Sequence, residues 1–204
     1  MNKIITISRE YGAGGHSIGQ QVAKELGIPF YDRDILKETV KTSGFDPDMV
    51  EHDQEDVSAT NFFLKSICSF SDASFSDTQN AIHDVQKAVI LHFAKEGPCV
   101  IVGRCADYAL AEFPNVVNVF LHADLQDRIV RIARRHDLTD AKAKDLIIKT
   151  DKRRASYYNY YTSKKWGDAA GYDLSLNTAT LGIDGTIHMI REFVAYKEKE
   201  HDKI

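Results

Sequence analysis

Short apolar runs alternate with amphipathic stretches along most of the chain. The β-branched run at residues 4–7 and the apolar runs at 99–102 and 116–121 are typical of buried strands. Shorter strands are expected just before Asp32 and at residues 172–176. Near-continuous apolar strands of this kind occur in parallel sheets that are covered by helices on both faces. The runs therefore predict a parallel sheet.

Between these runs, apolar side chains recur every three or four residues, which is the spacing of one helix face. Ile18, Val22 and Leu26 show this spacing, and Gly27 is placed to end their helix. The last helix is expected to turn Ile183 inward with its other apolar residues. Strands that alternate with helices predict an α/β protein. The expected helices cover residues 18–26, 35–44, 82–93, 125–135, 140–162 and 183–194.

The segment from Phe45 to about Thr78 has a different character. Residues 46–56 contain six acidic and no basic side chains, and a stretch rich in Ser and Phe follows. We expect a partly helical insertion here. It would belong to one domain that spans residues 1–204, because a chain of this length can bury one substantial core.

Positive charge is concentrated in one part of the chain. The formal net charge is −4, yet residues 128–165 hold twelve Lys or Arg against four acids, whereas residues 1–127 hold ten against nineteen. The net charge argues against a general nucleic-acid binder, and the basic stretch suggests a local anionic ligand such as a polyphosphate. A solvated helical face would give the same pattern, so charge alone leaves both interpretations open.

Cysteine use and the N-terminal residues indicate the cytoplasm. The three cysteines form no CxxC pair and are odd in number, which suits a reducing compartment better than a disulfide framework. The first ten residues lack the apolar run of a signal peptide, and no stretch approaches the length of a membrane span. A cytoplasmic protein without a membrane partner is expected.

A glycine-rich loop, SREYGAGGHS at residues 8–17, lies between the first expected strand and the first helix. Glycines let backbone N–H groups approach phosphate oxygens, and the N-terminus of the helix adds a favourable dipole. The hydroxyl of Ser17 could reach a magnesium ion on those phosphates. The loop therefore predicts a site for ATP with Mg²⁺ as cofactor. Its residues would be Gly12, Ala13, Gly14, Gly15, His16, Ser17 and Ile18.

Two other interpretations fit the same loop. A tight strand-to-helix turn would need glycine for its dihedral angles alone, but three glycines in four residues at this position favour a ligand site. A dinucleotide-binding turn would start at Gly12 and use Asp32 to hold a ribose. It is disfavoured because its third glycine would be Ser17 and because little chain is left for a substrate domain.

Several motifs resemble the cytidylate kinase-like family of P-loop proteins. They are ITISREYGAGGHSIGQQVAKELG, FYDRDIL, VIVGR, VFLHADLQDRIVRI, TDKRRASYYNYY and YDLSLNT, and they run in the family's order from Ile4 to about Val194. The resemblance implies a P-loop NTPase-type three-layer fold with a five-stranded parallel sheet, a helical acceptor lobe and a basic helical lid over the phosphates. In this chain the lobe would be the insertion at residues 45–85, and the lid would be residues 136–165.

The resemblance also implies roles for single residues. Asp32 and Arg33 would begin the acceptor site, and Arg104 would contact the acceptor phosphate. Arg153 and Arg154 would be catalytic arginines of the lid, where a planar guanidinium suits phosphate oxygens. The implied reaction transfers the γ-phosphoryl group of ATP to a small phosphorylated acceptor, with cytidylate as the first expectation.

The chain departs from the family pattern at three positions. Gly15 stands in place of the P-loop lysine, and Arg9 stands in place of the first glycine of the loop. Cys105 follows Arg104 where cytidylate kinases carry an acid. The lysine neutralises the transferring phosphoryl group, so its loss bears on catalytic efficiency. Arg9 is our candidate for the compensating catalytic charge, and the alternative is that it pairs with Glu10 or another surface acid.

Three functions stay open at this point. The first is a nucleoside monophosphate kinase, and the second is a kinase of another small metabolite. The third is a nucleotide-binding regulatory protein whose catalysis weakened with the loss of the lysine. The basic lid favours a kinase, because binding alone would not require it. No Walker-B carboxylate is identifiable, although Asp107 or Asp124 could hold a magnesium-bound water.

Overall fold

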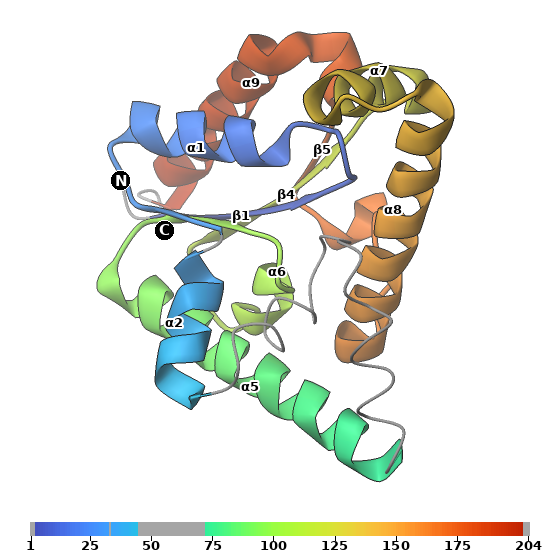
Figure 1. Ribbon diagram of the computed structural model, residues 1–204. Coiled ribbons are helices and arrows are strands. Elements are labelled where there is room, and N and C mark those ends of the chain that lie inside the picture. Colours follow the sequence, from blue (N-terminus) through green and yellow to red (C-terminus); the bar gives the residue numbers. More distant parts are fainter. Residues whose placement is uncertain (1–2, 33, 45–71, 202–204) are drawn as a thin grey trace.

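The computed structural model describes residues 3–32, 34–44 and 72–201, and shows a sheet with helices on both faces (Figure 1). All neighbouring strands are parallel, in the order β2-β3-β1-β4-β5. The predicted five-stranded parallel sheet is therefore confirmed. Its strands are β1 (Ile4–Arg9), β2 (Phe30–Tyr31), β3 (Val100–Val102), β4 (Val116–His122) and β5 (Leu174–Asn177).

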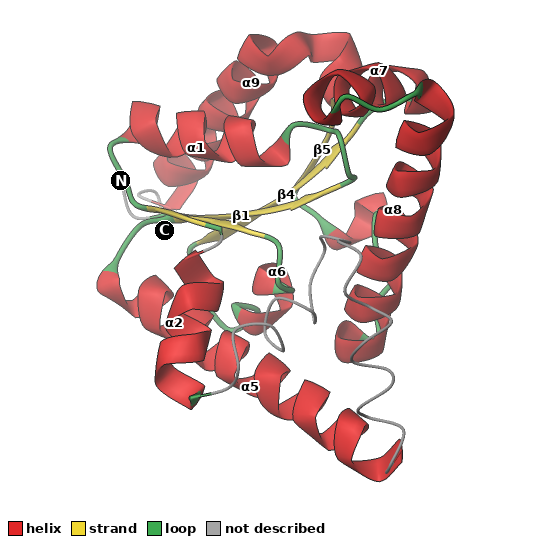
Figure 2. Ribbon diagram, in the orientation of Figure 1, coloured by secondary structure: helices red, strands yellow, loops and turns green. Residues whose placement is uncertain are grey.

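The described helices account for the two outer layers (Figure 2). Helices α1 and α9 pack on one face of the sheet, where Ile7, Ile18 and Ile190 belong to one buried cluster. Helices α2, α5 and α6 cover the other face, where a second cluster includes Ile35 and Ile101. The helices are α1 (Gly15–Leu26), α2 (Asp34–Ser43), α5 (Asp72–Glu96), α6 (Ala106–Ala109), α7 (Leu125–His136), α8 (Asp140–Thr162) and α9 (Thr178–His201).

The strand order places a ligand site next to β1. From β1 the chain goes to β2 and β3 on one side of it, and then to β4 and β5 on the other side. Ligands of open parallel sheets bind outside the carboxyl ends of the strands at such a reversal. The glycine loop leaves β1 at this edge, and α8 runs past the same edge (Figure 1).

The structure differs from the sequence predictions in three places. Helix α5 begins at Asp72, ten residues before the apolar spacing starts, because polar residues extend a helix without showing a period. The four residues of α6 are too few to show one. Gly182 interrupts α9 with φ 68° and ψ 175°. Ile183 consequently turns to the cleft and is 36% exposed, so its predicted inward position is wrong.

The predicted acceptor lobe lies largely outside the described residues. Residues 45–71 are not described, and the remainder of the range, residues 72–85, belongs to α5. Arg33, predicted to bind the acceptor, also lies outside the described residues. The division of the chain into core, lobe and lid therefore stays a prediction.

Candidate active site

The glycine loop has the backbone geometry of an anion site. Gly12 and Gly14 both have a φ of 87°, a left-handed conformation that is strained for other residues. Gly14 is the N-cap of α1, and the first turn of this helix carries no acid. The first N–H groups of a helix have no acceptor within it, and the helix dipole makes this end positive. An anion placed there would be stabilised by both effects.

Side chains from three helices hold the carbonyl groups of the loop. A carbonyl oxygen that faces a phosphate would repel it. In this loop, four carbonyl oxygens already accept hydrogen bonds from side chains of the protein. The loop is therefore held in one conformation with its acceptors satisfied. The donors are Arg154 to the carbonyl of Arg9 (2.9 Å), Arg128 to Tyr11 (3.3 Å), Arg131 to Gly12 (2.5 Å) and Thr178 to Ala13 (2.9 Å).

Asp151 of α8 ties the loop to α7. Its carboxylate accepts the N–H of Tyr11 at 2.7 Å and Nη1 of Arg128 at 2.5 Å. Arg128 Nε also lies 3.4 Å from a carboxylate oxygen of Glu10, which accepts the N–H of Ala123 at 3.1 Å. Arg128, the first residue of the basic stretch, thus has two acidic partners inside the protein, and its charge is largely neutralised there.

A cavity of about 610 Å³ opens along the loop. Gly12, Gly14, Gly15, His16 and Ser17 line it, whereas Ala13 and Ile18 are buried behind it. Arginines outnumber acids in its wall, which favours a polyanionic ligand. Its charged residues are Arg9, Arg104, Arg131, Arg135 and Arg154 against Glu10 and Asp32.

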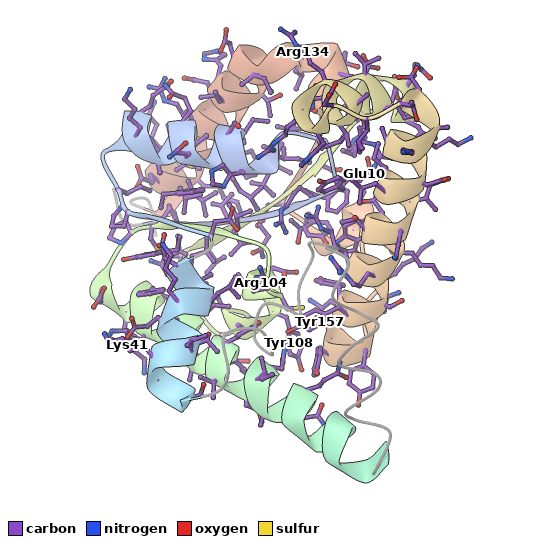
Figure 3. The ribbon with its side chains drawn as sticks, viewed as in Figure 1. Glu10, Lys41, Arg104, Tyr108, Arg134 and Tyr157 are labelled. Atoms are coloured by element: carbon purple, nitrogen blue, oxygen red, sulfur yellow. The ribbon has the colours of Figure 1, made fainter. Side chains whose placement is uncertain are left out.

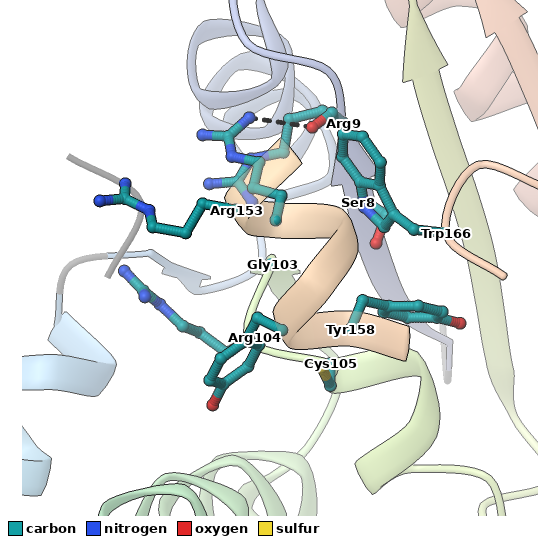
Figure 4. A pocket seen from close by; sticks show the side chains of 10 residues that line it. Ser8, Arg9, Gly103, Arg104, Cys105, Arg153, Tyr158 and Trp166 are labelled. Atoms are coloured by element: carbon teal, nitrogen blue, oxygen red, sulfur yellow. Dashed lines mark hydrogen bonds between the residues drawn. The ribbon is translucent and has the colours of Figure 1, made fainter. Parts of the chain in front are cut away.

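A smaller cavity of about 30 Å³ shares three residues with the larger one (Figure 4). All three are arginines: Arg9 ends β1, Arg104 follows β3, and Arg154 lies in α8. Arg104, which follows β3, and Tyr157 of α8 both line the smaller cavity, and both residues are labelled in Figure 3. The two cavities therefore meet at three arginines that the fold brings from three separate elements. Other residues that line the smaller cavity include Ser8, Cys105, Arg153, Tyr158 and Trp166.

A strained turn positions Arg104. Gly103, Arg104 and Cys105 have φ values of 78°, 59° and 53° in succession. Non-glycine residues rarely adopt such values, and they persist where the surrounding structure enforces them. Arg104 is buried at the carboxyl end of β3, and Cys105 is a buried thiol at the position where the family pattern has an acid.

The loop and the predicted start of the acceptor site are joined by His16 and Asp32. Nδ1 of His16 lies 2.5 Å from Oδ2 of Asp32, whose side chain is 12% exposed against 47% for the histidine. The ring of His16 also packs edge-on against Phe30 at 5.3 Å between centroids. A carboxylate in a cleft lined by arginines is thus held by a residue of the glycine loop itself.

The two arginines predicted for the lid occupy different places. Arg154 is buried, and its guanidinium lies 5.5 Å from the centre of the Tyr11 ring. Arg153 is partly exposed and lines only the smaller cavity. Neighbours on a helix point about 100° apart, so Arg154 reaches the loop and both cavities, whereas Arg153 reaches the smaller cavity alone. Movement of residues 136–165 as a lid stays a prediction.

The carboxylates suggested for magnesium lie elsewhere. Asp107 is buried in α6 and accepts the hydroxyl proton of Tyr158 at 2.6 Å. Burial raises the pKa of Asp107 despite this hydrogen bond. Asp124 is exposed ahead of α7. Neither residue lines either cavity, so the site gives no support to a magnesium role for them.

The larger cavity offers oxygen ligands that suit Mg²⁺. Ser17 and Asp32 both line it. Magnesium prefers oxygen and is usually held by one or two carboxylates together with substrate phosphates. Within residues 3–32, 34–44 and 72–201, no group of three or more His, Cys, Asp or Glu could hold a metal ion. The donor set therefore fits an ion that arrives with a nucleotide.

Among the described helices, none combines the length and apolar character needed to cross a membrane.

Comparison with known proteins places the chain in a family. The model of the cytidylate kinase-like family matches residues 4–180. The chain belongs to this family. As a cytidylate kinase-like protein it is a phosphotransferase of the nucleotide or small-metabolite kinase type. The family match confirms the resemblance seen in the sequence.

Named relatives of this cytidylate kinase-like protein are distant. The cytidylate kinase of Ignicoccus hospitalis is 22% identical over 196 residues, which is 94% of this chain and 98% of the relative. The cytidylate kinase of Halobacterium salinarum is 29% identical over 104 residues, so this match spans only 51% of the chain and 54% of the relative. The family model establishes the family, whereas sequence identities of 22% and 29% do not identify the acceptor.

Solved structures confirm the P-loop kinase fold. An uncharacterized protein from Eubacterium ventriosum has a TM-score of 0.73 at 26% identity, covering 95% of this chain and 98% of its own. Shikimate kinase from Bacteroides thetaiotaomicron has a TM-score of 0.54 at 17% identity, covering 96% and 99%. The second likeness shows the fold alone.

Three contacts of the site were not predicted from the sequence. They are the pairs His16–Asp32, Arg128–Asp151 and Asp107–Tyr158. Only the first had a signal, because the loop and the end of the second strand were expected at the same edge of the sheet. The others depend on how α8 lies against α7 and α6, which no local pattern encodes.

Proposed function

We propose that this protein transfers the γ-phosphoryl group of ATP to a nucleoside monophosphate, with cytidylate as the first candidate. The observation that carries the proposal is the meeting of two cavities at Arg9, Arg104 and Arg154, beside a glycine loop. Phosphoryl transfer requires donor and acceptor to be aligned and the charge of the transferring group to be stabilised. The arginines at the junction supply the charge, and the larger cavity of about 610 Å³ offers the room in which the ligands would be aligned.

The triphosphate of ATP would lie along the loop in the larger cavity. There the first N–H groups of α1 face it, and the carbonyl groups of the loop are already hydrogen-bonded by side chains. Ser17 and Asp32 would hold Mg²⁺ beside it. When bound, this ion would neutralise oxygens of the phosphate chain and help to orient them.

The transferring group would sit where the cavities meet. Arg9, Arg104 and Arg154 would surround its oxygens, and Arg153 would face it from the smaller cavity. Fixed charges around the oxygens stabilise the transition state without reorganising during the reaction. The aromatic residues Tyr158 and Trp166 line the smaller cavity and would help to exclude water, which would otherwise compete with the acceptor.

Cytidylate is the first acceptor to test because the family, and a relative that is matched over 98% of its length, carry that name. Arg104 would contact the acceptor phosphate. The absence of an acid after it, where Cys105 is buried, is a reason to test other monophosphates as well.

A second candidate is transfer to a hydroxyl group of a small metabolite. The pair of His16 and Asp32 favours it, because an acceptor hydroxyl must lose a proton whereas a phosphate acceptor need not. A carboxylate that is fixed by a histidine in the cleft has the chemistry of a general base. In this alternative Asp32 would accept the proton rather than hold the metal ion.

The proposal is tested by incubating the protein with ATP and Mg²⁺ and a panel of acceptors. The panel contains the common nucleoside monophosphates and a set of hydroxylated metabolites. Formation of the phosphorylated acceptor is measured separately from hydrolysis of ATP. We expect transfer to at least one monophosphate, with cytidylate the best, at a rate well above hydrolysis.

Other outcomes separate the alternatives. Transfer only to a hydroxylated metabolite would replace the first candidate with the second. Binding of ATP by calorimetry without transfer to any acceptor would contradict both, and would favour a regulatory nucleotide-binding role.

A further inference from the structure

Positions 9 and 15 of this chain depart from the P-loop pattern in a reciprocal way. The pattern GxxxxGK opens with glycine and carries its lysine six residues later. Here the first position is Arg9 and the lysine position is Gly15, with Gly14 kept between them. A cation has been lost at one end of the loop and another is present at the other end.

The side chain of Arg9 occupies the space beside Gly15. A Cβ atom added at Gly15 would lie 2.6 Å from Cγ of Arg9, 3.0 Å from its Cβ and 3.2 Å from its Cδ. Real Cβ atoms do not approach other carbon atoms to 2.6 Å. Any side chain at position 15 would therefore displace Arg9.

The backbone of Gly15 gives no separate reason for glycine. Gly12 and Gly14 have positive φ values, but Gly15 is not among the described glycines that do, and it begins α1. Its missing side chain is therefore explained by the stem of Arg9 that packs on it. The residue types at positions 9 and 15 depend on each other.

Arg9 is well placed to act as a cation. It ends β1, where it pairs with Leu121 of β4, and its carbonyl is held by Arg154 at 2.9 Å (Figure 4). Its side chain is buried but lines both cavities. The carboxylate of Glu10, one of the alternative partners considered from the sequence, accepts the N–H of Ala123 and lies near Arg128.

We propose that Arg9 and Gly15 have exchanged the roles of the P-loop glycine and lysine. Arg9 crosses over Gly15 and supplies to the β- and γ-phosphate oxygens the positive charge that lysine supplies in the usual loop. This inference rests on the proposed function and makes Arg9 a catalytic residue. A guanidinium can donate two parallel hydrogen bonds to a phosphate, whereas an ammonium acts as a point charge.

The exchange is tested by restoring the usual pattern. Arg9→Met keeps an unbranched stem over Gly15 and removes the charge, and we expect kcat to fall about 100-fold. In Arg9→Gly, kcat should fall by at least the same factor. The double variant Arg9→Gly/Gly15→Lys rebuilds the pattern GxxxxGK, and its kcat should be at least about tenfold higher than that of Arg9→Gly. Gly15→Lys alone should lose activity because Arg9 still fills the space.

Arg134→Ala is the control, because Arg134 is an exposed arginine of α7 that lines neither cavity. It should keep wild-type kcat. Thermal melting and circular dichroism show which variants fold. If the double variant does not fold, the kcat of Arg9→Met alone decides whether Arg9 supplies the charge of the P-loop lysine.

Two results would overturn the exchange while leaving the kinase function intact. One is a folded Arg9→Met with kcat within about threefold of wild type. The other is a folded double variant no more active than Arg9→Gly. If wild type transfers no phosphoryl group, the proposed function fails instead, and calorimetry still decides the inference. Arg9→Met must then weaken the binding of ATP more than the binding of AMP. Equal weakening of the two nucleotides would overturn the exchange.

Discussion

The two sides of the arginine junction are built differently. On the side of the glycine loop, four carbonyl groups are held by side chains from α7, α8 and α9, and Asp151 ties the loop to both α7 and α8. On the proposed acceptor side, the strained turn at Arg104 and the buried Cys105 carry the distinctive features.

This difference separates what is general in the site from what is specific. A backbone that presents N–H groups to phosphates serves any nucleoside triphosphate. Under the proposed function the acceptor side must recognise one molecule, so its side chains would decide specificity. The loss of the family's acid at Cys105 falls on this side, whereas the exchange at positions 9 and 15 keeps the loop's charge. Changes on the loop side should therefore abolish ATP binding, and changes at the junction should mainly reduce transfer.

The largest effect is expected from Gly14→Val. At φ 87° a β-branched residue is strained, and its Cβ would meet Cδ1 of Ile183 at 3.1 Å. The side chain would also stand where we propose that the phosphates bind, so ATP affinity measured by calorimetry should fall at least about 100-fold. Gly185→Val is the matched control, because Gly185 lies within α9 and a Cβ there makes only an ordinary contact at 3.5 Å. Normal ATP binding by Gly14→Val would refute the loop assignment.

Arg104→Ala should separate transfer from ATP binding. Arg104 lines both cavities and would touch the transferring group, so kcat/KM for the acceptor should fall about 100-fold. The dissociation constant of ATP should stay within about threefold of wild type, because in the proposed site the loop, rather than Arg104, would hold the triphosphate. Steady-state kinetics and calorimetry measure the two quantities. An equal loss in kcat/KM for the acceptor and in ATP affinity would show that Arg104 binds ATP rather than acting on the transferring group.

Arg128→Ala tests the support of the loop. It leaves the carboxylate of Asp151, whose side chain is 17% exposed, without the partner at 2.5 Å. Breaking a largely buried pair typically costs about 3 kcal/mol, which corresponds to a melting temperature lower by ~6–12 °C in a chain of this size. Arg191→Ala is the control, because its pair with Glu25 is half-exposed and should be worth less than about 1 kcal/mol. Equal melting temperatures for the two variants would contradict the support role.

The smallest effect concerns pH and the contact between α5 and α8. His83 stacks on Tyr161 with ring centres 3.7 Å apart, and its Nδ1 lies 2.9 Å from the hydroxyl of Tyr157. Burial lowers the pKa of His83 below its usual 6.5, with Lys87 adding to the shift and Asp84 opposing it.

Because the unfolded chain gains the proton first, stability should be unaffected by His83 above pH 6.5 and should decline from there down to its lowered folded pKa. Melting curves of wild type and His83→Gln across this range measure the difference. We expect the slope to be shallower in the variant. Parallel curves would show that His83 titrates normally in the folded protein.

Much of the fold could be predicted from the sequence, because strands and long helices repeat a local pattern. The expected helix at 140–162 has the bounds of α8, and the loop was found from its glycines alone. The polar start of α5 and the break at Gly182 carry no such pattern. In the site, Arg9 was suggested by its position, but its packing on Gly15 and the pair of His16 and Asp32 depend on tertiary structure.

The central claim is that the γ-phosphate of ATP lies where the two cavities meet. A crystal structure of the protein with Mg²⁺ and a non-hydrolysable ATP analogue tests it most directly. We predict the triphosphate along Gly12 to Ser17, with γ-phosphate oxygens within hydrogen-bond distance, about 3.5 Å, of at least two of Arg9, Arg104 and Arg154. A triphosphate bound away from the loop, or a γ-phosphate that contacts none of the three arginines, would contradict the account.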